Sequence, residues 1–457
     1  MSESTNSRRD FLKMGGAMLA AGTAGCATGV TGSAMAGGAS APAVMSSKDY
    51  IKLPPKKGPR LVVVGAGTSG MTIAAHAKKD YPAFDVVLVD KRDMYSSCFN
   101  SSLWYVGIIN LEFLAAHSFL DAAVNNGYNF VCATVTGLDR AAKKLYTNDG
   151  AIEYDFLVLA PGISYDWEKI GVTDPENRYQ VQQRWPGGFI SPMEHVSIRN
   201  KFQNFEGGTW ITTNPSGNYR CLPGQYERSC LIAAWIKKNG IPGKVILLDA
   251  NPEITIKKQG FHDAFDTLYK DVLTWIPNAA VKGVDHEKKV IKTEFDEYKF
   301  DEATIYPNVR GNTLIEQLGL MAPTTKSNQK EGDNDVRFYN YTGDPHVYIT
   351  GDARSQPYSK SANTSNSEGQ FVAKVLAARA QGKEIAWESP ETVCYSMTQA
   401  YPTPEAIKVD AKYTYDPKTD KITGFSPDTK TWEVRDAAMG RAYLEWAQGI
   451  YRDMFGQ

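Results

Sequence analysis

Several features that point to other classes of protein are missing from this sequence of 457 residues. Fifty lysines and arginines nearly balance 51 aspartates and glutamates, so the net charge gives no reason to expect binding to nucleic acid. No C-x-x-C-H motif occurs, which excludes a c-type haem attached to this chain. Internal repeats and long low-complexity tracts are also missing. With 42% hydrophobic and 22% charged residues, the composition is typical of a globular protein of two or three domains.

The N-terminal segment resembles an export signal rather than part of a fold. Residues 7–13 read S-R-R-D-F-L-K, a twin-arginine pattern, and precede an apolar, Gly/Ala-rich run over 14–27. This run is too short and too weakly hydrophobic for a membrane anchor. We therefore expect a twin-arginine signal peptide over residues 1–36, cleaved after Ala36 or Ala41, and a linker over 37–57. The mature protein should then work in the periplasm, exported with its cofactor already inserted and with no integral membrane segment.

The next stretch has the pattern of a strand, a glycine-rich turn, a helix and a second strand. An apolar, β-branched run over 61–64 is followed by G-x-G-x-x-G over 65–70 and a helix-compatible segment over 71–79. A second apolar run, 86–89, ends in Asp90. The glycine motif alone is weak evidence, but these parts in register favour a dinucleotide-binding site.

Each residue of that turn has a physical role in such a site. Gly65 permits the tight turn, Gly67 lets the backbone approach a pyrophosphate, and Gly70 lets the helix pack closely on the strand. The free N–H groups at the helix N-terminus attract the pyrophosphate. Asp90 is placed to accept hydrogen bonds from the ribose hydroxyls, and we include Ser69 in the same cofactor-binding set.

A second α/β unit follows, but its first loop lacks the glycine motif. We expect a strand over 209–213, a helix over 227–238 and a strand over 244–249, which is the order of half a Rossmann domain. The intervening loop, 214–224, reads N-P-S-G-N-Y-R-C-L-P-G and contains Cys221 instead of a phosphate-binding turn. The sequence therefore predicts a domain with the fold of a nicotinamide-binding domain that no longer binds a nicotinamide.

The chain is then expected to return to the first domain. A strand that ends in Gly351-Asp352 has the pattern in which the aspartate binds a ribityl hydroxyl of FAD, and a helix over 361–380 follows it. The strand over 154–160, with a small-residue turn at Gly162, has the pattern of strands that leave an FAD domain. We predict an α/β, two-dinucleotide-binding-domain flavoprotein of the glutathione-reductase-like class with a C-terminal interface domain. The predicted boundaries are 58–163 and 332–385 for a discontinuous FAD-binding domain, 164–331 for the degenerate NAD-binding-like domain and 386–457 for the C-terminal domain.

Six cysteines separate into three groups. Cys26 leaves with the signal. Cys132, in a predicted strand, and Cys230, in a predicted helix, are expected to be small buried hydrophobic residues. The remaining three are expected in loops or at element ends, where they are candidates for chemistry: Cys98, Cys221 and Cys394.

Around these three cysteines the chain resembles the flavoprotein subunit of flavocytochrome c sulfide dehydrogenase, a relative of the sulfide:quinone oxidoreductases. The likeness extends over essentially the whole mature chain, to the aromatic segment around Trp446. Its motifs are G-A-G-T-S-G over 65–70, the loop over 95–101, R-C-x-P-G-x-Y-E-R over 220–228, Gly351-Asp352 and C-Y-S over 394–396. The chain departs from the family pattern at Arg354 and at the additional Cys230, which offers Cys221 an alternative partner.

The resemblance implies a site and a reaction. FAD would be attached through a thioether from Cys98 to the flavin 8α-methyl group, Cys221 and Cys394 would form a redox disulfide over the isoalloxazine ring, and Glu227 would accept a proton. Hydrosulfide attack on that disulfide would give a persulfide and a thiolate, which passes two electrons to the flavin. The full cofactor-binding set is Gly65, Gly67, Ser69, Gly70, Asp90, Cys98, Gly162, Gly351, Asp352 and Lys360, and no metal ligands are expected.

Electrons must then leave the flavin. The missing haem and nicotinamide motifs leave a separate c-type cytochrome subunit as the expected acceptor. A quinone is less favoured, because acidic residues interrupt the apolar stripe of the helix expected over 438–455. Two alternatives remain for the activity: oxidation of another small thiol or sulfur compound, or electron transfer by a flavoprotein without its own substrate. For single residues, Glu227 is alternatively a helix N-terminal acid, and the disulfide a structural crosslink.

Overall fold

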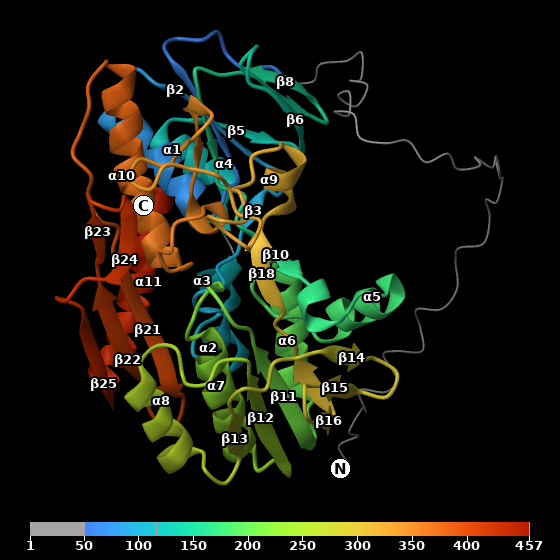
Figure 1. Ribbon diagram of the computed structural model, residues 1–457. Helices are drawn as coiled ribbons and strands as arrows, with labels where there is room; N and C mark the ends of the chain where they lie inside the picture. The colour runs from blue at the N-terminus through green and yellow to red at the C-terminus, as the bar shows by residue number, and fades with distance from the viewer. Residues whose placement is uncertain (1–50, 116, 457) are drawn as a thin grey trace, which may run out of the picture. The chain divides into compact units, whose positions relative to one another are not determined.

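The structure is a computed structural model that describes residues 51–115 and 117–456. The predicted signal peptide, Cys26 and most of the predicted linker lie outside the described residues. The described residues all belong to one unit of the chain, in which two parallel sheets and a C-terminal antiparallel sheet can be followed in Figure 1.

The first parallel sheet is assembled from segments at both ends of the chain. In spatial order it contains β19 (Asn340–Tyr341), β20 (Asp344–Ile349), β9 (Phe156–Leu159), β1 (Arg60–Val64), β2 (Asp85–Asp90) and β5 (Asn129–Cys132). Strand β1 runs parallel to both β2 and β9, and β20 runs parallel to β9, whereas the short edge strand β19 is antiparallel to β20. The chain therefore returns to its first sheet some 180 residues after leaving it, as the Gly351-Asp352 pattern predicts.

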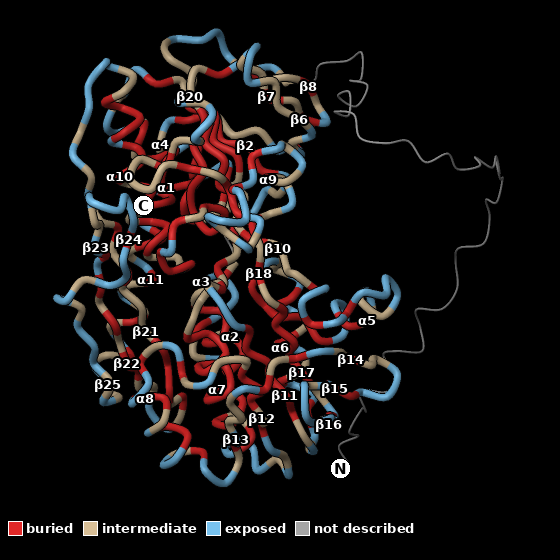
Figure 2. Tube along the Cα trace, in the orientation of Figure 1, coloured by how far each residue is buried: buried red, intermediate tan, exposed pale blue. Residues whose placement is uncertain are grey.

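Both faces of this sheet are buried, which explains the unbroken apolar run in β1. Leu61 and Val63 pack with helices α1 (Thr68–Asp80) and α10 (Ala362–Ala380) on one face. Val62 and Val64 pack on the other face with the small sheet of β6 (Val135–Asp139), β7 (Lys144–Thr147) and β8 (Gly150–Glu153). Figure 2 shows the resulting buried centre of the sheet between more exposed outer segments.

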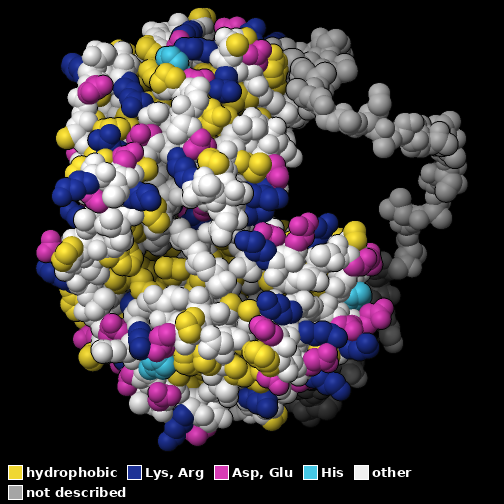
Figure 3. Space-filling view, in the orientation of Figure 1, with side chains coloured by type: hydrophobic (Ala, Val, Ile, Leu, Met, Phe, Trp, Pro, Cys, Tyr) yellow, Lys and Arg dark blue, Asp and Glu magenta, His cyan; other side chains and the backbone are white. Residues whose placement is uncertain are grey.

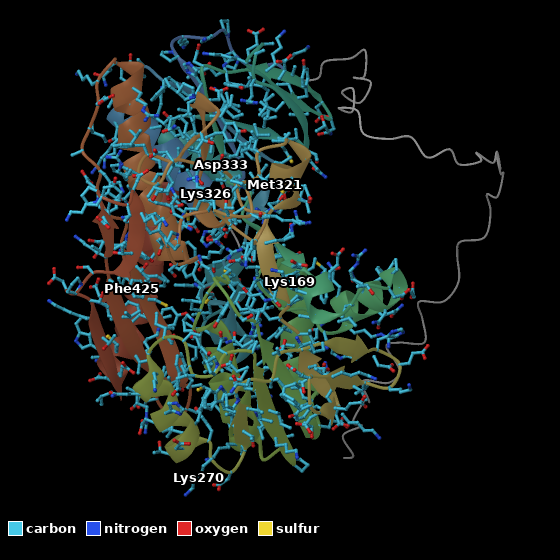
Figure 4. All side chains as sticks on the ribbon, viewed as in Figure 1. Lys169, Lys270, Met321, Lys326, Asp333 and Phe425 are labelled. Atoms are coloured by element: carbon cyan, nitrogen blue, oxygen red, sulfur yellow. The ribbon has the colours of Figure 1, made fainter. Side chains whose placement is uncertain are left out.

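The second parallel sheet has the order β13 (Leu273–Ile276), β12 (Gly243–Asp249), β11 (Gly208–Asn214) and β17 (Glu302–Thr304). Helices α7 (Gly224–Asn239) and α6 (Pro192–Asn204) pack against it through an aromatic-rich core. Two antiparallel strands, β10 (Ile163–Asp166) and β18 (Asn308–Gly311), pair where the chain passes between the two sheets. Before it re-enters the first sheet, the returning segment is held by an ion pair of Lys326 with Asp333, at 2.8 Å, and Figure 4 labels both side chains.

The C-terminal region consists of β21 (Thr392–Gln399), β22 (Glu405–Ala411) and β25 (Lys430–Asp436), followed by α11 (Ala437–Phe455). The apolar stripe of α11 is buried against this protein's own core, because Tyr443 packs with the second sheet's cluster and Met454 with the first sheet's. Hydrophobic side chains gather in a hollow of the face viewed in Figure 3, over β21, α11 and α3 (Leu111–Ala115). Within the two described ranges, no helix combines the length and the hydropathy of a membrane span.

The remaining elements are short and connect these layers. They are β3 (Met94–Tyr95), α2 (Ser101–Tyr105), β4 (His117–Ser118), α4 (Phe119–Asn126), α5 (Pro175–Arg184), α8 (Lys258–Asp263), β14 (Gly283–Asp285), β15 (Val290–Lys292), β16 (Glu297–Lys299), α9 (Thr313–Gln317), β23 (Tyr413–Asp416) and β24 (Lys421–Phe425).

The segments 111–115 and 119–126 form two separate helices, α3 and α4, and Ser118 caps the second by accepting hydrogen bonds from the backbone of Leu120 and Asp121. One expectation from the sequence is wrong. Cys132 is exposed rather than buried, because it is the last residue of β5, the edge strand of its sheet. Helix α7 also begins three residues before the expected Glu227.

Candidate active site

The glycine-rich turn has the geometry that its sequence predicts. Gly65 has φ +98°, and a Cβ atom there would lie 2.4 Å from the carbonyl oxygen of Ala160 in the neighbouring β9 segment. A Cβ atom on Gly70 would lie 1.9 Å from the carbonyl oxygen of Gly65. A Cβ atom on Gly67, in contrast, would meet no atom within 4 Å. The first and third glycines are therefore required by the fold, whereas the second leaves open space for a ligand.

Two polar side chains hold this turn in place. Asp90, at the end of β2, accepts hydrogen bonds from the backbone N–H of Ala66 at 2.7 Å and from that of Arg92 at 2.9 Å. Ser69 donates to the hydroxyl of Thr350 at 3.0 Å, which joins the start of α1 to the end of β20. The two chain segments that the sequence assigns to the FAD site are thus in direct contact.

A pocket of about 510 Å³ opens along this turn. It is lined by eight of the ten residues predicted to bind the cofactor: Gly65, Gly67, Ser69, Asp90, Cys98, Gly162, Gly351 and Asp352. The residues fit FAD. Oδ1 of Asp352 is buried without a hydrogen-bond partner in the described part of the chain, while its other oxygen pairs with Arg220 at 3.2 Å. An unpaired buried carboxylate oxygen is costly unless a donor reaches it, and a ribityl hydroxyl is such a donor.

A second, smaller pocket of about 30 Å³ contains the candidate catalytic residues. Cys221, Cys394 and Glu227 line it, and Cys98, Arg220, Ser361 and Ala362 form a wall that it shares with the larger pocket. The structure therefore brings together residues that are far apart in the sequence, next to the predicted FAD site. The five described cysteines are free thiols.

Cys221 is held by the segment that precedes α10. Its backbone has φ +58°, a left-handed conformation that is unfavourable for a residue with a Cβ atom by roughly 1–2 kcal/mol. Its N–H donates to the carbonyl oxygen of Lys360 at 2.8 Å, and its own carbonyl accepts from Gly224 at the start of α7. Lys360, predicted in the cofactor set, thus positions the thiol loop through its backbone, while its buried ammonium pairs with Glu331.

Cys394 lies in strand β21 rather than in a loop. Lys257, in the loop before α8, reaches it across 137 positions of sequence. The Lys257 ammonium donates to the carbonyl oxygen of Cys394 at 3.1 Å and to the hydroxyl of Ser396 at 2.6 Å, and lies 3.6 Å from the Cys394 sulfur. Sequence reasoning missed Lys257, because no motif surrounds it and only the fold places it beside a thiol.

Glu227 lies in the first turn of α7 and is 4% exposed. Burial raises its pKa from 4.5 to about 7, against the opposing effects of the Met397 N–H, which donates to Oε1 at 2.9 Å, and of Lys257. Burial also raises the pKa of both thiols, and that of Cys221 is raised well above its ordinary value, with a further contribution from Cys394. A carboxyl group with a pKa near neutrality, beside two thiols, suits proton transfer.

The two departures from the family pattern, Arg354 and Cys230, do not line the thiol pocket. Arg354 is fully buried and pairs with Glu368 at 2.6 Å, and Glu368 also accepts from the backbone N–H of Gly351. This departure from the family pattern therefore supports the Gly351-Asp352 turn. Cys230 is buried in the core of the second sheet and does not line the thiol pocket, so the structure does not favour it as a partner for Cys221.

Helix α11 fixes the loop that contains Cys98, a contact that the sequence did not reveal. Tyr451 donates to the hydroxyl of Ser97 at 2.8 Å and accepts from the side-chain amide of Asn100 at 3.1 Å. Tyr443 donates to the carbonyl oxygen of Phe99. Hydroxyls of α11 therefore hold residues on both sides of Cys98, through the side chains of Ser97 and Asn100 and the backbone of Phe99.

In the second sheet, the carboxylate at the end of β12 is covered by the protein's own side chains. Asp249 has the position that Asp90 has in the first sheet, but it is fully buried. Its carboxylate accepts from the hydroxyl of Tyr226 at 2.7 Å, from the indole N–H of Trp275 at 3.1 Å and from Asn251 at 2.8 Å. Its oxygens are thus occupied by the protein's own side chains.

The two parallel sheets, the glycine turn and the thiol pocket define a flavoprotein of the two-dinucleotide-domain class. Accordingly, a family model described as pyridine nucleotide-disulphide oxidoreductase matches residues 59–181. Two models specific to flavocytochrome c sulfide dehydrogenase also match: the central region of its flavoprotein chain, at 196–307, and its flavin-binding region, at 389–455. These matches confirm the resemblance predicted from the sequence, and the three regions that they match are similar to those of flavin-dependent oxidoreductases.

Similar individual proteins agree with these matches. A type II NADH:quinone oxidoreductase of Staphylococcus epidermidis is 30% identical over 154 residues, 32% of this chain and 35% of that protein. The mitochondrial sulfide:quinone oxidoreductase of Mus musculus is 25% identical over 191 residues, 39% of each chain. These matches thus span little more than a third of either curated relative. The structure of the sulfide:quinone oxidoreductase of Aquifex aeolicus covers 88% of this chain and 92% of its own with TM-score 0.68 and 15% identity, which shows a common fold.

Proposed function

We propose that this protein is the flavoprotein component of a sulfide dehydrogenase, which oxidises sulfide to sulfur or polysulfide with FAD as its cofactor. The observation that carries the proposal is the small pocket in which two thiols and a buried carboxyl group meet, sharing the wall around Cys98 with the predicted FAD site. The family matches support the same substrate class, because both sulfide dehydrogenase models include parts of this pocket.

The thiol pair performs the sulfur chemistry in its oxidised form, a disulfide between Cys221 and Cys394. Hydrosulfide attacks one sulfur, the S–S bond breaks, and a persulfide and a thiolate remain. A second hydrosulfide takes the outer sulfur of the persulfide, which releases HS–SH and leaves both cysteines as thiolates. Loss of two electrons from the pair then re-forms the disulfide.

FAD, when bound, supplies the two-electron acceptor for this reoxidation. Glu227 accepts the proton that HS–SH gives up as it leaves as a polysulfide anion. The pKa of about 7 suits this role, because the carboxyl group then accepts and releases a proton near neutral pH.

Cys98 is the proposed point of covalent attachment of FAD. It lies in the wall between the two pockets, and hydroxyls of α11 hold its loop. Covalent attachment would keep the cofactor with an exported protein. Periplasmic localisation rests on the twin-arginine pattern of residues 7–13.

A c-type cytochrome subunit is the proposed electron acceptor. One matching family model carries the name flavocytochrome c, and this chain has no C-x-x-C-H motif of its own. The haem would therefore belong to a separate polypeptide.

The size of the thiol pocket favours sulfide over larger thiols. Its volume of about 30 Å³ holds two or three water-sized molecules, at roughly 10–15 Å³ each. Hydrosulfide enters such a space, whereas glutathione does not. A flavoprotein that only carried electrons would have no use for two thiols in this position.

Anaerobic reduction of the purified holoprotein tests the proposal. Sulfide should bleach the flavin absorbance, with at least 100-fold lower rates for cysteine and glutathione at equal thiolate concentration. Equal rates with all three would show that the substrates are thiols in general rather than sulfide. No bleaching by any of them would refute the proposed activity.

A further inference from the structure

Lys257 is a buried lysine whose ammonium faces the thiol pair. It is 3% exposed, and no described carboxylate lies within ion-pair distance of it. A buried ammonium is unfavourable unless hydrogen bonds or an anion compensate for its lost hydration. The ammonium of Lys257 is therefore stabilised when a negative charge forms on a neighbouring group of the site.

The three N–H groups of this ammonium match three acceptors around one cysteine. Two are the carbonyl oxygen of Cys394 and the hydroxyl of Ser396, and the third is the Cys394 sulfur at 3.6 Å. The backbone of Lys257 also has φ +53°, a conformation that residues other than glycine rarely adopt. The fold holds the residue against its backbone preference with the side chain directed at Cys394.

The two thiols are therefore not equivalent. The ammonium of Lys257 is in hydrogen-bond contact with the sulfur of Cys394, and the structure gives it no such contact with that of Cys221. The titratable and charged groups that face the pair, besides the two thiols themselves, are Lys257, Glu227 from α7, Tyr443 from α11, Tyr306, Arg220 and Cys98. Among these groups, Lys257 is the cation for which the structure records a hydrogen bond to a cysteine sulfur, that of Cys394, so negative charge is stabilised best on Cys394.

Resting on the proposed function, we propose that Lys257 sets the direction of the thiol exchange. Hydrosulfide attacks Sγ of Cys221, the bond between the two cysteine sulfurs breaks, and its electron pair leaves on Sγ of Cys394. The persulfide thus forms on Cys221, and the thiolate of Cys394 pairs with the Lys257 ammonium. Thiolates of lower basicity are the better leaving groups in such exchanges, which gives the cation its kinetic effect.

Alkylation of the reduced holoprotein tests this asymmetry without sulfide. Under anaerobic conditions at pH 7, iodoacetamide should modify Cys394 at least ten times faster than Cys221, as measured by peptide mass spectrometry. Lys257→Met should slow modification of Cys394 at least tenfold and shift its pH profile to higher pH. Lys258→Met is the matched control, because that neighbouring lysine is exposed and pairs with Glu253, and it should leave the rates unchanged.

Lys257→Gln separates charge from structure. Glutamine keeps an N–H donor on its side chain but carries no charge, so it should behave like Lys257→Met. Recovery of the wild-type alkylation rate by Lys257→Gln would show a merely structural role and overturn the proposal. Bound FAD and the melting temperature report whether each variant is folded.

A single turnover with sulfide distinguishes failure of this inference from failure of the proposed function. Trapping with iodoacetamide should find the additional sulfur on Cys221. Additional sulfur on Cys394 would overturn the assignment while leaving sulfide oxidation intact. Additional sulfur on neither cysteine would contradict the proposed function, and the alkylation ratio would then decide the role of Lys257 by itself.

Discussion

The two parallel sheets of this protein start from the same βαβ arrangement and use it differently. In both, the first strand pairs with the second in parallel, β1 with β2 and β11 with β12, and a helix begins just beyond the first strand. After β1 the loop over 65–67 is short and contains two of the three glycines of the motif, and Gly67 leaves open space. After β11 the loop is longer and contains Cys221, whose backbone is tied to Lys360.

The carboxylates at the ends of the second strands differ in the same way. Asp90 lines the large pocket, whereas Asp249 is buried under Tyr226 and Trp275. The same topology thus provides the predicted dinucleotide site in the first sheet, whereas in the second sheet the corresponding loop positions a thiol. Helix α7 still begins at this loop, and its first turn carries Glu227 to the same pocket.

Substitution of the third glycine of the motif, which lies in the first turn of α1, should have the largest effect. Gly70→Ala would place a Cβ atom 1.9 Å from a backbone oxygen that has no room to move, so we expect a loss of stability of about 3 kcal/mol and little soluble holoprotein. Gly67→Ala is the control for folding, because its Cβ atom meets no protein atom, and it should lower FAD content while the apoprotein stays folded. Melting temperature and flavin content measure both effects, and equal behaviour of the two variants would contradict the assigned roles.

Loss of either thiol of the second loop's pocket should affect the reaction rather than the fold. Cys221→Ser and Cys394→Ser should each lower the rate of flavin reduction by sulfide at least 1000-fold and retain FAD. Cys132→Ser is the matched control, since that cysteine is exposed outside the pocket, and it should stay within twofold of wild type. Stopped-flow absorbance measures the rates. A disulfide that only stabilises the fold would instead lower the melting temperature and leave the rate intact.

Substitution of Glu227 should have an intermediate effect that depends on pH. With a pKa of about 7, the carboxyl group is ionised only at higher pH, so the wild-type rate at constant hydrosulfide concentration should rise through pH 7. Glu227→Gln should lower the rate about 100-fold and remove this dependence.

The free energy of unfolding of the wild-type protein should fall with rising pH, whereas the rate rises. A folded-state pKa above the ordinary 4.5 stabilises the protein at low pH and loses that contribution as the pH rises through about 7. Glu227→Gln should therefore be more stable than wild type at pH 8, by about 1–3 kcal/mol, and this difference should disappear at pH 4. Urea denaturation at the two pH values measures it, and a variant less stable than wild type at pH 8 would contradict the raised pKa.

Replacement of Cys98 should have the smallest effect on the rate and the clearest effect on the cofactor bond. Acid precipitation of the wild-type protein should leave the yellow colour in the pellet, and Cys98→Ser should release it to the supernatant. We expect the variant to retain bound FAD before acid treatment, because the rest of the large pocket is unchanged. Flavin in the supernatant of the wild-type protein would refute covalent attachment.

Much of the fold follows from local patterns. The apolar run of β1, the spacing of Gly65, Gly67 and Gly70, and the strand before Gly351 predict the first sheet, because each pattern has few alternative conformations. The break between α3 and α4 does not follow from such a pattern, since it depends on the cap by Ser118 and on the pairing of β4 with β3. The exposure of Cys132 depends on its place in an edge strand, which is a property of the whole sheet.

The site was predicted through a family resemblance for Cys98, Cys221, Cys394 and Glu227. Lys257 and the tyrosines of α11 were not predicted, because their contacts join segments separated by more than 130 positions and carry no motif. The side chains that surround Asp249 could not be predicted either, since the sequence shows an acidic residue at the end of a strand in both sheets.

The most direct test of the difference between the two sheets compares two electron donors on one sample of holoprotein. Under anaerobic conditions, sulfide should bleach the flavin within the mixing time of a manual assay, whereas NADH at millimolar concentration should do so at least 1000 times more slowly. The expectation rests on the missing phosphate-binding turn after β11 and on the buried carboxylate of Asp249. Rapid bleaching by NADH would contradict it and show that the second sheet still binds a nicotinamide.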